Sequence, residues 1–341
     1  MIILLKAGVG REQAGPLLRR MMDAGADGMY VTGRDGRGLI VARGRERAVR
    51  DLHLESHPLV ERLVPIDPAY EHARRRADAI GTTVTLGSQR IGGRLFAIVA
   101  GPPCVETRRQ FLSTAMMLKE SGAHALRGDV FRVRPHTDSF EGVGLKGMDV
   151  VREVARQTGL PIVTGVTSPS DVAALESQVE GLQVPGEYMA DLRLLDALGE
   201  SRLPVILTRG TSATLDDLLL SAERILQRGN RGVILCEQGI RAVANPLRAT
   251  LDLVSVPELR RLTHLPLVVD PSRRASSRED VLPLAAAALA VGADGLLLDV
   301  HVRPEEARVG GQTTLAPAGF KQLMNKLQPL AKAVGRDLVR G

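Results

Sequence analysis

Residues 203–239, LPVILTRGTSATLDDLLLSAERILQRGNRGVILCEQG, carry the pattern that decides the fold. A short apolar run at 204–207 is followed by helically spaced leucines at 214–227 and by a second apolar run at 232–235. Short apolar runs bounded by glycine and polar residues are typical of buried parallel strands, and the 3.6-residue period is typical of a helix. The stretch is therefore predicted to form a β–α–β unit.

The same alternation continues over residues 95–341. The strand candidates are 96–100, 123–126, 161–164, 182–184, 204–207, 232–235, 266–269 and 295–298, and helical stretches include 107–120, 170–179, 214–227, 280–291 and 318–333. Eight strands alternating with helices predict a (β/α)8 barrel. An open doubly wound sheet is the alternative, but no GxGxxG sequence follows any of these strands.

The first 65 residues predict a smaller domain. Strands at 1–6, 28–32, 38–42 and 60–65, with helices at 11–24 and 45–51, give the βαββαβ order of a ferredoxin-like domain. The glycine-rich turn at 33–37 is interpreted as a hairpin, because it lacks the lysine and serine or threonine that end a P-loop. Residues 66–94 are predicted to be a linker helix (66–81) followed by a hairpin.

Composition excludes several classes of protein. The chain has 341 residues, 44% of them hydrophobic and 25% charged, which is typical of a globular protein. There is no long apolar run and no signal-peptide pattern, so a cytoplasmic protein that does not interact with membranes is expected. The net charge is +6, only six of the 45 basic residues are lysines, and tryptophan is absent. This balance favours an anionic small-molecule ligand over a nucleic acid.

In (β/α)8 barrels the active site lies at the C-terminal ends of the strands. Charged and polar residues follow the predicted strands here, among them Arg127, Glu187, Arg209, Glu237, Asp270 and Asp299. A ligand site at this mouth is therefore predicted. No lysine lies between Lys146 and Lys321, which excludes a Schiff-base aldolase with its lysine on a later strand.

Several short motifs carry a resemblance to a known family. They are Ala100-Gly101-Pro102, Leu126-Arg127-Gly128, Ser139-Phe140-Glu141-Gly142, Leu235-Cys236-Glu237, Gly239-Ile240-Arg241, Val269-Asp270-Pro271-Ser272 and Val300-His301. In this order the chain resembles 3-deoxy-D-arabino-heptulosonate 7-phosphate (DAHP) synthases, the microbial subgroup with an N-terminal ferredoxin-like domain. The resemblance implies a metal-dependent, aldol-like condensation of phosphoenolpyruvate with erythrose 4-phosphate. It also implies a homodimer or homotetramer.

The metal ligands implied by the resemblance are not retained. The cysteine, histidine, glutamate and aspartate positions are occupied by Pro103, Arg273, Asp299 and Gly310. A divalent ion needs several converging anionic or neutral donors, and a guanidinium would repel it. No metal or other cofactor is therefore expected. A rearranged site made of Cys104, Asp299 and His301 is the alternative.

The implied phosphoenolpyruvate site is also altered. Where the resemblance implies phosphate-binding arginines, this chain has Glu187 and Gln238. Where it implies lysines, the chain has Thr208 and Arg132, and where it implies a glutamate, the chain has Gly165. Arg127, Arg134 and the pair Arg209-Gly210 are retained. A carboxylate at position 187 reverses the field where a phosphate would bind.

We therefore expect a repurposed, metal-independent enzyme that acts on an anionic, carboxylate-bearing molecule. The candidate catalytic residues are Glu187, Glu237, Asp270, Arg273 and Asp299, and the candidate substrate-binding residues are Arg127, Arg132, Arg134, Thr208, Arg209, Gln238 and His301. His136 and Asp138 are expected to assist, whereas Asp270 and Glu237 could instead be scaffold carboxylates paired with arginine. The alternatives are an authentic DAHP synthase with a rearranged metal site and a catalytically silent binding or regulatory homologue. The sequence names neither the substrate nor a ligand of the N-terminal domain.

Overall fold

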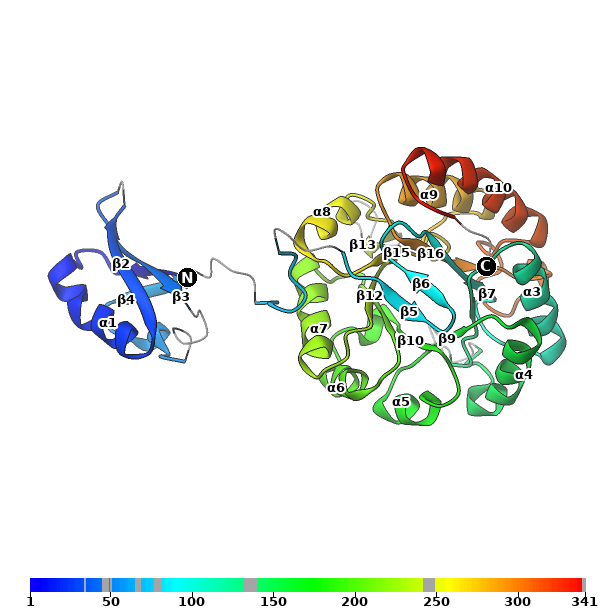
Figure 1. Cartoon of the computed structure of the whole chain (residues 1–341), viewed down its shortest axis with the longest axis horizontal. Helices are drawn as coiled ribbons and strands as arrows, with labels where there is room; N and C mark the ends of the chain where they lie inside the picture. Colours follow the sequence, from blue (N-terminus) through cyan, green and yellow to red (C-terminus); the bar gives the residue numbers. More distant parts are fainter. Residues whose placement is uncertain are drawn as a thin grey trace. The chain divides into compact units, whose positions relative to one another are not determined.

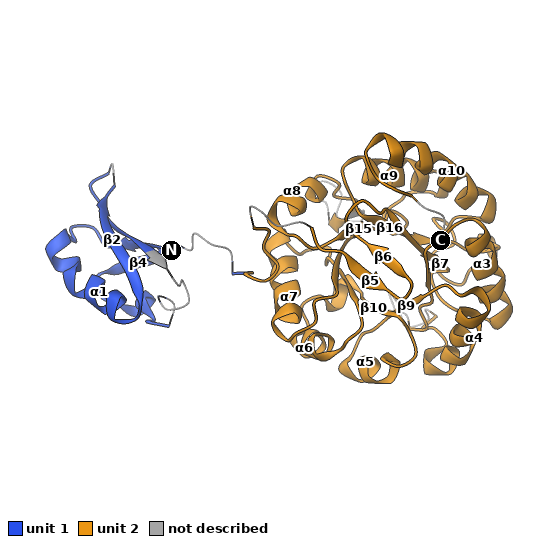
Figure 2. Cartoon of the chain, viewed as in Figure 1, with its two compact units in different colours: residues 1–69 blue, residues 70–341 orange. Residues whose placement is uncertain are grey.

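A computed structural model describes residues 1–33, 35–44, 49, 51–64, 69–76, 81–131, 140–241 and 249–338. The chain divides into two compact units, Met1–Ala69 and Tyr70–Gly341 (Figure 2).

The first unit contains a four-stranded antiparallel sheet with a helix. Its elements are β1 (Ile2–Leu5), α1 (Arg11–Asp23), β2 (Ala26–Thr32), β3 (Gly38–Gly44), the short 3-10 helix η1 (Leu54–Ser56) and β4 (Val60–Val64). The strand order β2-β3-β1-β4 is that of a ferredoxin-like domain, as predicted. Gly36, at φ +77°, lies in the predicted β2–β3 hairpin turn. Most of the helix predicted at 45–51 lies outside the described residues.

The second unit is a closed parallel barrel, which confirms the predicted fold (Figure 1). Its strands are β7 (Ala97–Gly101), β8 (Ala125–Arg127), β9 (Ile162–Gly165), β10 (Gly181–Val184), β11 (Val205–Thr208), β12 (Val233–Glu237), β15 (Leu267–Val269) and β16 (Gly295–Asp299). Each strand pairs with the barrel strand that follows it in the chain, and β16 pairs with β7 to close the barrel. The apolar runs in the sequence arise because both faces of these strands are buried.

Helices surround the barrel in Figure 1. They are α3 (Arg108–Glu120), α4 (Met148–Thr158), α5 (Pro169–Leu175), α6 (Leu192–Glu200), α7 (Leu215–Gln227), α8 (Ser255–Leu262), α9 (Arg278–Ala290) and α10 (Pro317–Ala333). The start of α7 shows why the sequence signals worked: Thr214 and Asp217 form a capping box that satisfies backbone N–H groups of the first turn. Within the described ranges, no helix is both long and apolar enough to span a membrane.

The barrel is closed at its N-terminal end by the hairpin of β5 (Val84–Leu86) and β6 (Gln89–Ile91). Val84, Leu86 and Ile91 form one buried cluster with the lower inward-facing side chains of the barrel, such as Ile206 and Ile234. Because this end is filled with apolar side chains, the open mouth is at the C-terminal ends of the strands.

The linker helix predicted at 66–81 is wrong in its described part. Residues 69–76 form turns and an isolated bridge between Arg74 and Thr263. The backbone N–H groups of His72 and Ala73 donate to the buried carboxylate of Glu223, at 2.7 and 2.9 Å. These long-range hydrogen bonds replace the intrahelical ones that the polar sequence favoured.

Candidate active site

The inward-facing residues at the upper ends of the strands form the floor of the mouth. Side chains alternate between the two faces of a strand, so the residues two positions beyond the buried inner cluster also face inward. This layer consists of Gly101, Arg127, Gly165, Gln183, Thr208, Cys236, Asp270 and Asp299. Polar and charged side chains therefore replace the apolar ones of the layer below.

Arg127 is the centre of a buried cluster with three aspartates. Its Nε donates to Asp129 Oδ2 at 2.9 Å, and its Nη1 donates to Asp299 Oδ1 at 2.9 Å and to Asp270 Oδ2 at 3.4 Å. Arg127 is 1% exposed. Three carboxylates around one guanidinium leave a net negative charge when all are ionised, so Arg127 is already engaged by acidic partners before any ligand arrives.

Burial and charge act in opposite directions on this cluster. Burial alone lowers the pKa of Arg127, but Asp129, Asp299 and Asp270 outweigh it, so that its pKa lies above the usual range. Burial raises the pKa of Asp270, the charge of Asp299 adds to this, and Arg127 and Arg273 oppose it. The protonated form of Asp270 is therefore favoured relative to that of an exposed aspartate.

Arg273 is the more accessible cation beside this cluster. Its backbone N–H donates to Asp270 Oδ1 at 3.2 Å, its Nε lies 3.7 Å from Asp270 Oδ2, and its side chain is 28% exposed. Among the described residues its Nε, which is buried, has no hydrogen-bond partner. The Arg273 side chain is therefore more accessible than that of Arg127, which is 1% exposed.

A second ion cluster lies behind the barrel wall. Arg209 Nη1 donates to Glu237 Oε2 at 2.9 Å and to Asp252 Oδ2 at 3.0 Å, and Arg209 Nε donates to the carbonyl of Ala213. Burial raises the pKa of Glu237, although Arg209 opposes it. Since Glu237 follows the inward-facing Cys236, its side chain points away from the barrel axis. This arrangement matches the scaffold interpretation of Glu237.

Between β10 and β12 the floor is uncharged. Gln183 Nε2 donates to Thr208 Oγ1 at 3.3 Å, and the Thr208 hydroxyl is hydrogen-bonded to the Cys236 thiol. Burial raises the pKa of Cys236, so the thiol stays protonated. Gln238 turns back and donates from Nε2 to the carbonyl of Arg209 at 3.2 Å.

His301 lies beyond the end of β16 and is 2% exposed. The backbone N–H of Arg303 donates to its Nδ1 at 2.9 Å, so in the neutral ring Nε2 carries the proton. That Nε2 is buried and has no hydrogen-bond partner within the described part of the chain. Burial lowers the pKa of His301 against the opposing charges of Glu106, Glu305 and Glu306. It is therefore an uncharged N–H donor at neutral pH.

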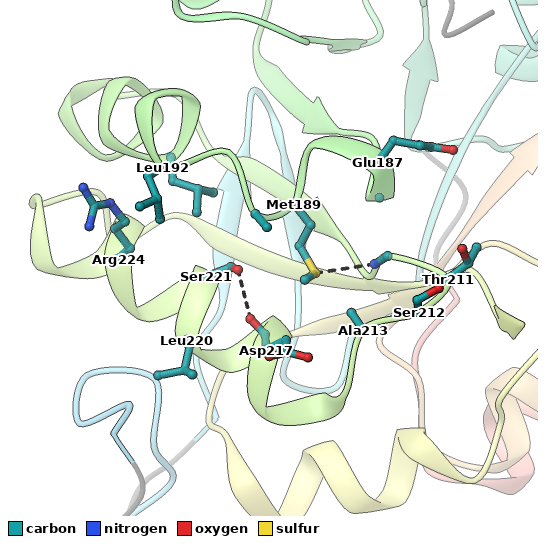
Figure 3. A pocket seen from close by; sticks show the side chains of 14 residues that line it. Glu187, Met189, Leu192, Thr211, Ser212, Ala213, Asp217, Leu220, Ser221 and Arg224 are labelled. Carbon is teal, nitrogen blue, oxygen red and sulfur yellow. Dashed lines mark hydrogen bonds between the residues drawn. The ribbon is translucent and has the colours of Figure 1, made fainter. Parts of the chain in front are cut away.

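Glu187 lies in the short 3-10 helix η3 (Gly186–Tyr188) that follows β10. It lies at one edge of a hollow of about 520 Å³ between α6 and α7, with Arg224 at another edge and Met189 between them (Figure 3). The backbone N–H of Gly210 donates to Met189 Sδ at 3.4 Å across this hollow. Its lining is largely apolar, with Leu192 and Leu220 exposed at the rim.

Four predicted residues, Arg132, Arg134, His136 and Asp138, lie outside the described residues. Cys104 lies in the β7–α3 loop, and its thiol donates to the carbonyl of Asp129 at 3.3 Å.

Comparisons with known proteins agree with this geometry. The pattern that defines the DAHP synthetase I family matches residues 80–335. The chain belongs to this family. It is 35% identical to the phospho-2-dehydro-3-deoxyheptonate aldolase of Thermotoga maritima over 98% of this chain and 99% of that protein. The crystal structure of that DAHP synthase superposes with a TM-score of 0.89 at 98% coverage of both chains.

Relatives of lower identity carry a different name. The 2-dehydro-3-deoxyphosphooctonate aldolase of Syntrophobacter fumaroxidans is 29% identical over 72% of this chain and 91% of its own length. Both named relatives are aldolases, so the chain shares its scaffold with aldolase-type enzymes.

The metal implied by the family resemblance does not fit these residues. A Cβ added to Gly310 would lie 3.7 Å from Pro103 Cγ, so two of the implied ligand positions do meet, but neither carries a donor side chain. Arg273 brings a cation to the third position, and Asp299 at the fourth is paired with Arg127. Across the described ranges, no three His, Cys, Asp or Glu side chains gather into a metal site.

Three residues of the mouth were missed by the sequence prediction: Gln183, Cys236 and Arg274. Gln183 and Cys236 could have been found from the alternation of side chains along each strand. Arg274 carries no such signal, because it lies in a loop whose direction is set by the tertiary structure.

Proposed function

We propose that this chain is an aldolase-type enzyme of the DAHP synthase family that acts on a carboxylate-bearing small molecule without the family's metal. The observation that carries the proposal is the guanidinium of Arg273. It lies against Asp270 at 3.7 Å, at the position where the resemblance puts a histidine ligand. A fixed cation supplies electrostatic stabilisation of an anion without a divalent ion.

The proposed roles follow from accessibility and protonation. Arg273 binds the substrate carboxylate, because its side chain is 28% exposed and its ion pair with Asp270 is long, at 3.7 Å. Asp270 holds or releases the proton at the reacting oxygen, since burial raises its pKa. His301 offers a neutral N–H to a substrate oxygen. Arg127 and Asp299 keep Asp270 in place through their ion pairs.

The second candidate is the reaction of the relatives, DAHP synthesis. The observation that favours it is the 35% identity to the Thermotoga maritima enzyme over nearly the whole of both chains. It requires a metal site and a phosphate site built from side chains other than those that the resemblance implies.

The test is consumption of phosphoenolpyruvate in the presence of erythrose 4-phosphate. The chain is first treated with a chelator and then assayed with and without added manganese. No turnover in either condition is expected, together with binding of small carboxylates that Arg273→Gln weakens. Manganese-dependent turnover would establish the second candidate and overturn the first. Carboxylate binding without turnover of any 2-oxo acid would favour a non-catalytic binding protein. Sedimentation analysis would test the proposed homodimer or homotetramer.

A further inference from the structure

The mouth contains a buried hydrogen-bond acceptor, the side-chain oxygen of Gln183. Gln183 is 4% exposed and its Nε2 donates to Thr208, yet its Oε1 has no hydrogen-bond partner among the residues that the structure describes. Its amide faces the interior of the barrel at the end of β10, beside Thr208 and Cys236. Buried polar atoms are nearly always paired, so an inward-facing orphan acceptor in a ligand site indicates a ligand group that donates.

The charges around this acceptor disfavour an anion. The guanidinium of Arg209 is held behind the wall by Glu237 and Asp252. Burial and the charge of Arg273 lower the pKa of Arg274, against the charges of Asp270, Glu187 and Glu237. One of these three carboxylates, that of Glu187, is exposed in the helix η3 that follows β10.

Resting on the proposed function, we propose that the β10–β12 part of the mouth binds a hydroxyl group and that the substrate is an unphosphorylated hydroxy acid. The hydroxyl donates to Gln183 Oε1, and Glu187 repels a phosphoryl group in its place. A phosphoryl group carries a charge of about −1.5 to −2 and chiefly accepts hydrogen bonds. It would meet an acceptor and a carboxylate here, whereas a hydroxyl is uncharged and can donate its one proton to the Gln183 acceptor.

Glycolate and 2-phosphoglycolate test the preference for a hydroxyl over a phosphoryl group. The two compounds differ only in whether the hydroxyl oxygen carries a phosphoryl group. Dissociation constants are measured for the full chain by ligand-observed NMR. The wild type is expected to bind glycolate at least about tenfold more tightly than 2-phosphoglycolate, since like-charge contacts are strongly unfavourable. Gln183→Leu is expected to weaken glycolate binding with little change in melting temperature, because it removes an unpaired acceptor together with the hydrogen bond to Thr208.

The double variant Glu187→Arg/Gln238→Arg tests the charge. It is expected to strengthen binding of 2-phosphoglycolate by at least about tenfold. Its control is Glu120→Arg, which makes the charge change of the Glu187→Arg half at the exposed end of α3 and should leave both constants unchanged. If the double variant does not fold, the wild-type preference and Gln183→Leu still test the inference.

Tighter binding of 2-phosphoglycolate than of glycolate by the wild type would overturn this inference and leave the proposed function standing. Unchanged glycolate binding by a folded Gln183→Leu variant would overturn it as well. Binding of neither compound by the wild type would overturn both this inference and the proposed carboxylate site.

Discussion

Replacing Arg127 with methionine should destabilise the barrel strongly at neutral pH. The substitution keeps an unbranched side chain but leaves Asp129, Asp270 and Asp299 without their shared cation, and their side chains are 7%, 1% and 4% exposed. Removing one partner of a buried ion pair costs about 3–5 kcal/mol. The three pairs share one cation and the aspartates can take up protons, so we expect this amount in total. That corresponds to a fall in melting temperature on the order of 10 °C.

The loss of stability in Arg127→Met should depend on pH. Burial already raises the folded-state pKa of Asp270 above the ordinary value of 3.8, and loss of the Arg127 charge, which opposes this, raises it further. Carboxyls with a raised folded pKa destabilise the protein above their unfolded pKa, and this penalty disappears as acidification protonates them. The gap in melting temperature between Arg127→Met and wild type should therefore be full at pH 7 and shrink towards pH 4.5.

Thermal melting followed by circular dichroism at the two pH values measures this effect. The control is Arg94→Met, which removes an exposed arginine, 78% accessible, from its pair with Asp337 and should cost less than about 1 kcal/mol. A loss from Arg127→Met as small as that of the control, or one equal at both pH values, would refute the reasoning that this cation neutralises buried carboxylates.

Three further predictions concern other parts of the barrel. Glu223→Gln should cost about 1–3 kcal/mol in urea unfolding at pH 7, because the carboxylate accepts from His72 and Ala73. Burial raises the pKa of Glu223, but these hydrogen bonds outweigh it and keep the pKa below 4.5. The loss of unfolding free energy in Glu223→Gln should therefore become smaller as the pH falls below that value. A loss that is the same at every pH would contradict the argument. Gly101→Ala should abolish soluble expression, since its Cβ would collide with the carbonyl of Arg127, whereas Gly15→Ala, with open space around it, should be tolerated. The ring of His301 should show an uncharged, Nε2-protonated imidazole by nitrogen NMR at pH 6.5, because burial lowers its pKa; a charged ring there would remove it as a neutral donor.

The fold could be predicted because its signals are local. Apolar runs such as 204–207 and 232–235 became β11 and β12 with shifts of one or two residues, and Thr214 began α7 as a capping residue does. The linker at 69–76 could not be predicted in the same way, because its conformation depends on Glu223, about 150 residues away in the chain. A polar segment with weak local preference follows the long-range hydrogen bonds that it finds.

The sequence by itself determined the barrel, the ferredoxin-like unit and the family, because hydrophobic periodicity and short motifs are properties of neighbouring residues. It also placed Arg273 and Glu187 at the mouth. Only the tertiary structure decided which charges neutralise one another. Arg127 is separated from Asp270 by 143 residues and from Asp299 by 172, and only closure of the barrel brings them into contact. That contact turns Arg127 from a predicted ligand-binding arginine into the centre of a buried cluster, and leaves Arg273 and Gln183 as the residues proposed to bind the substrate.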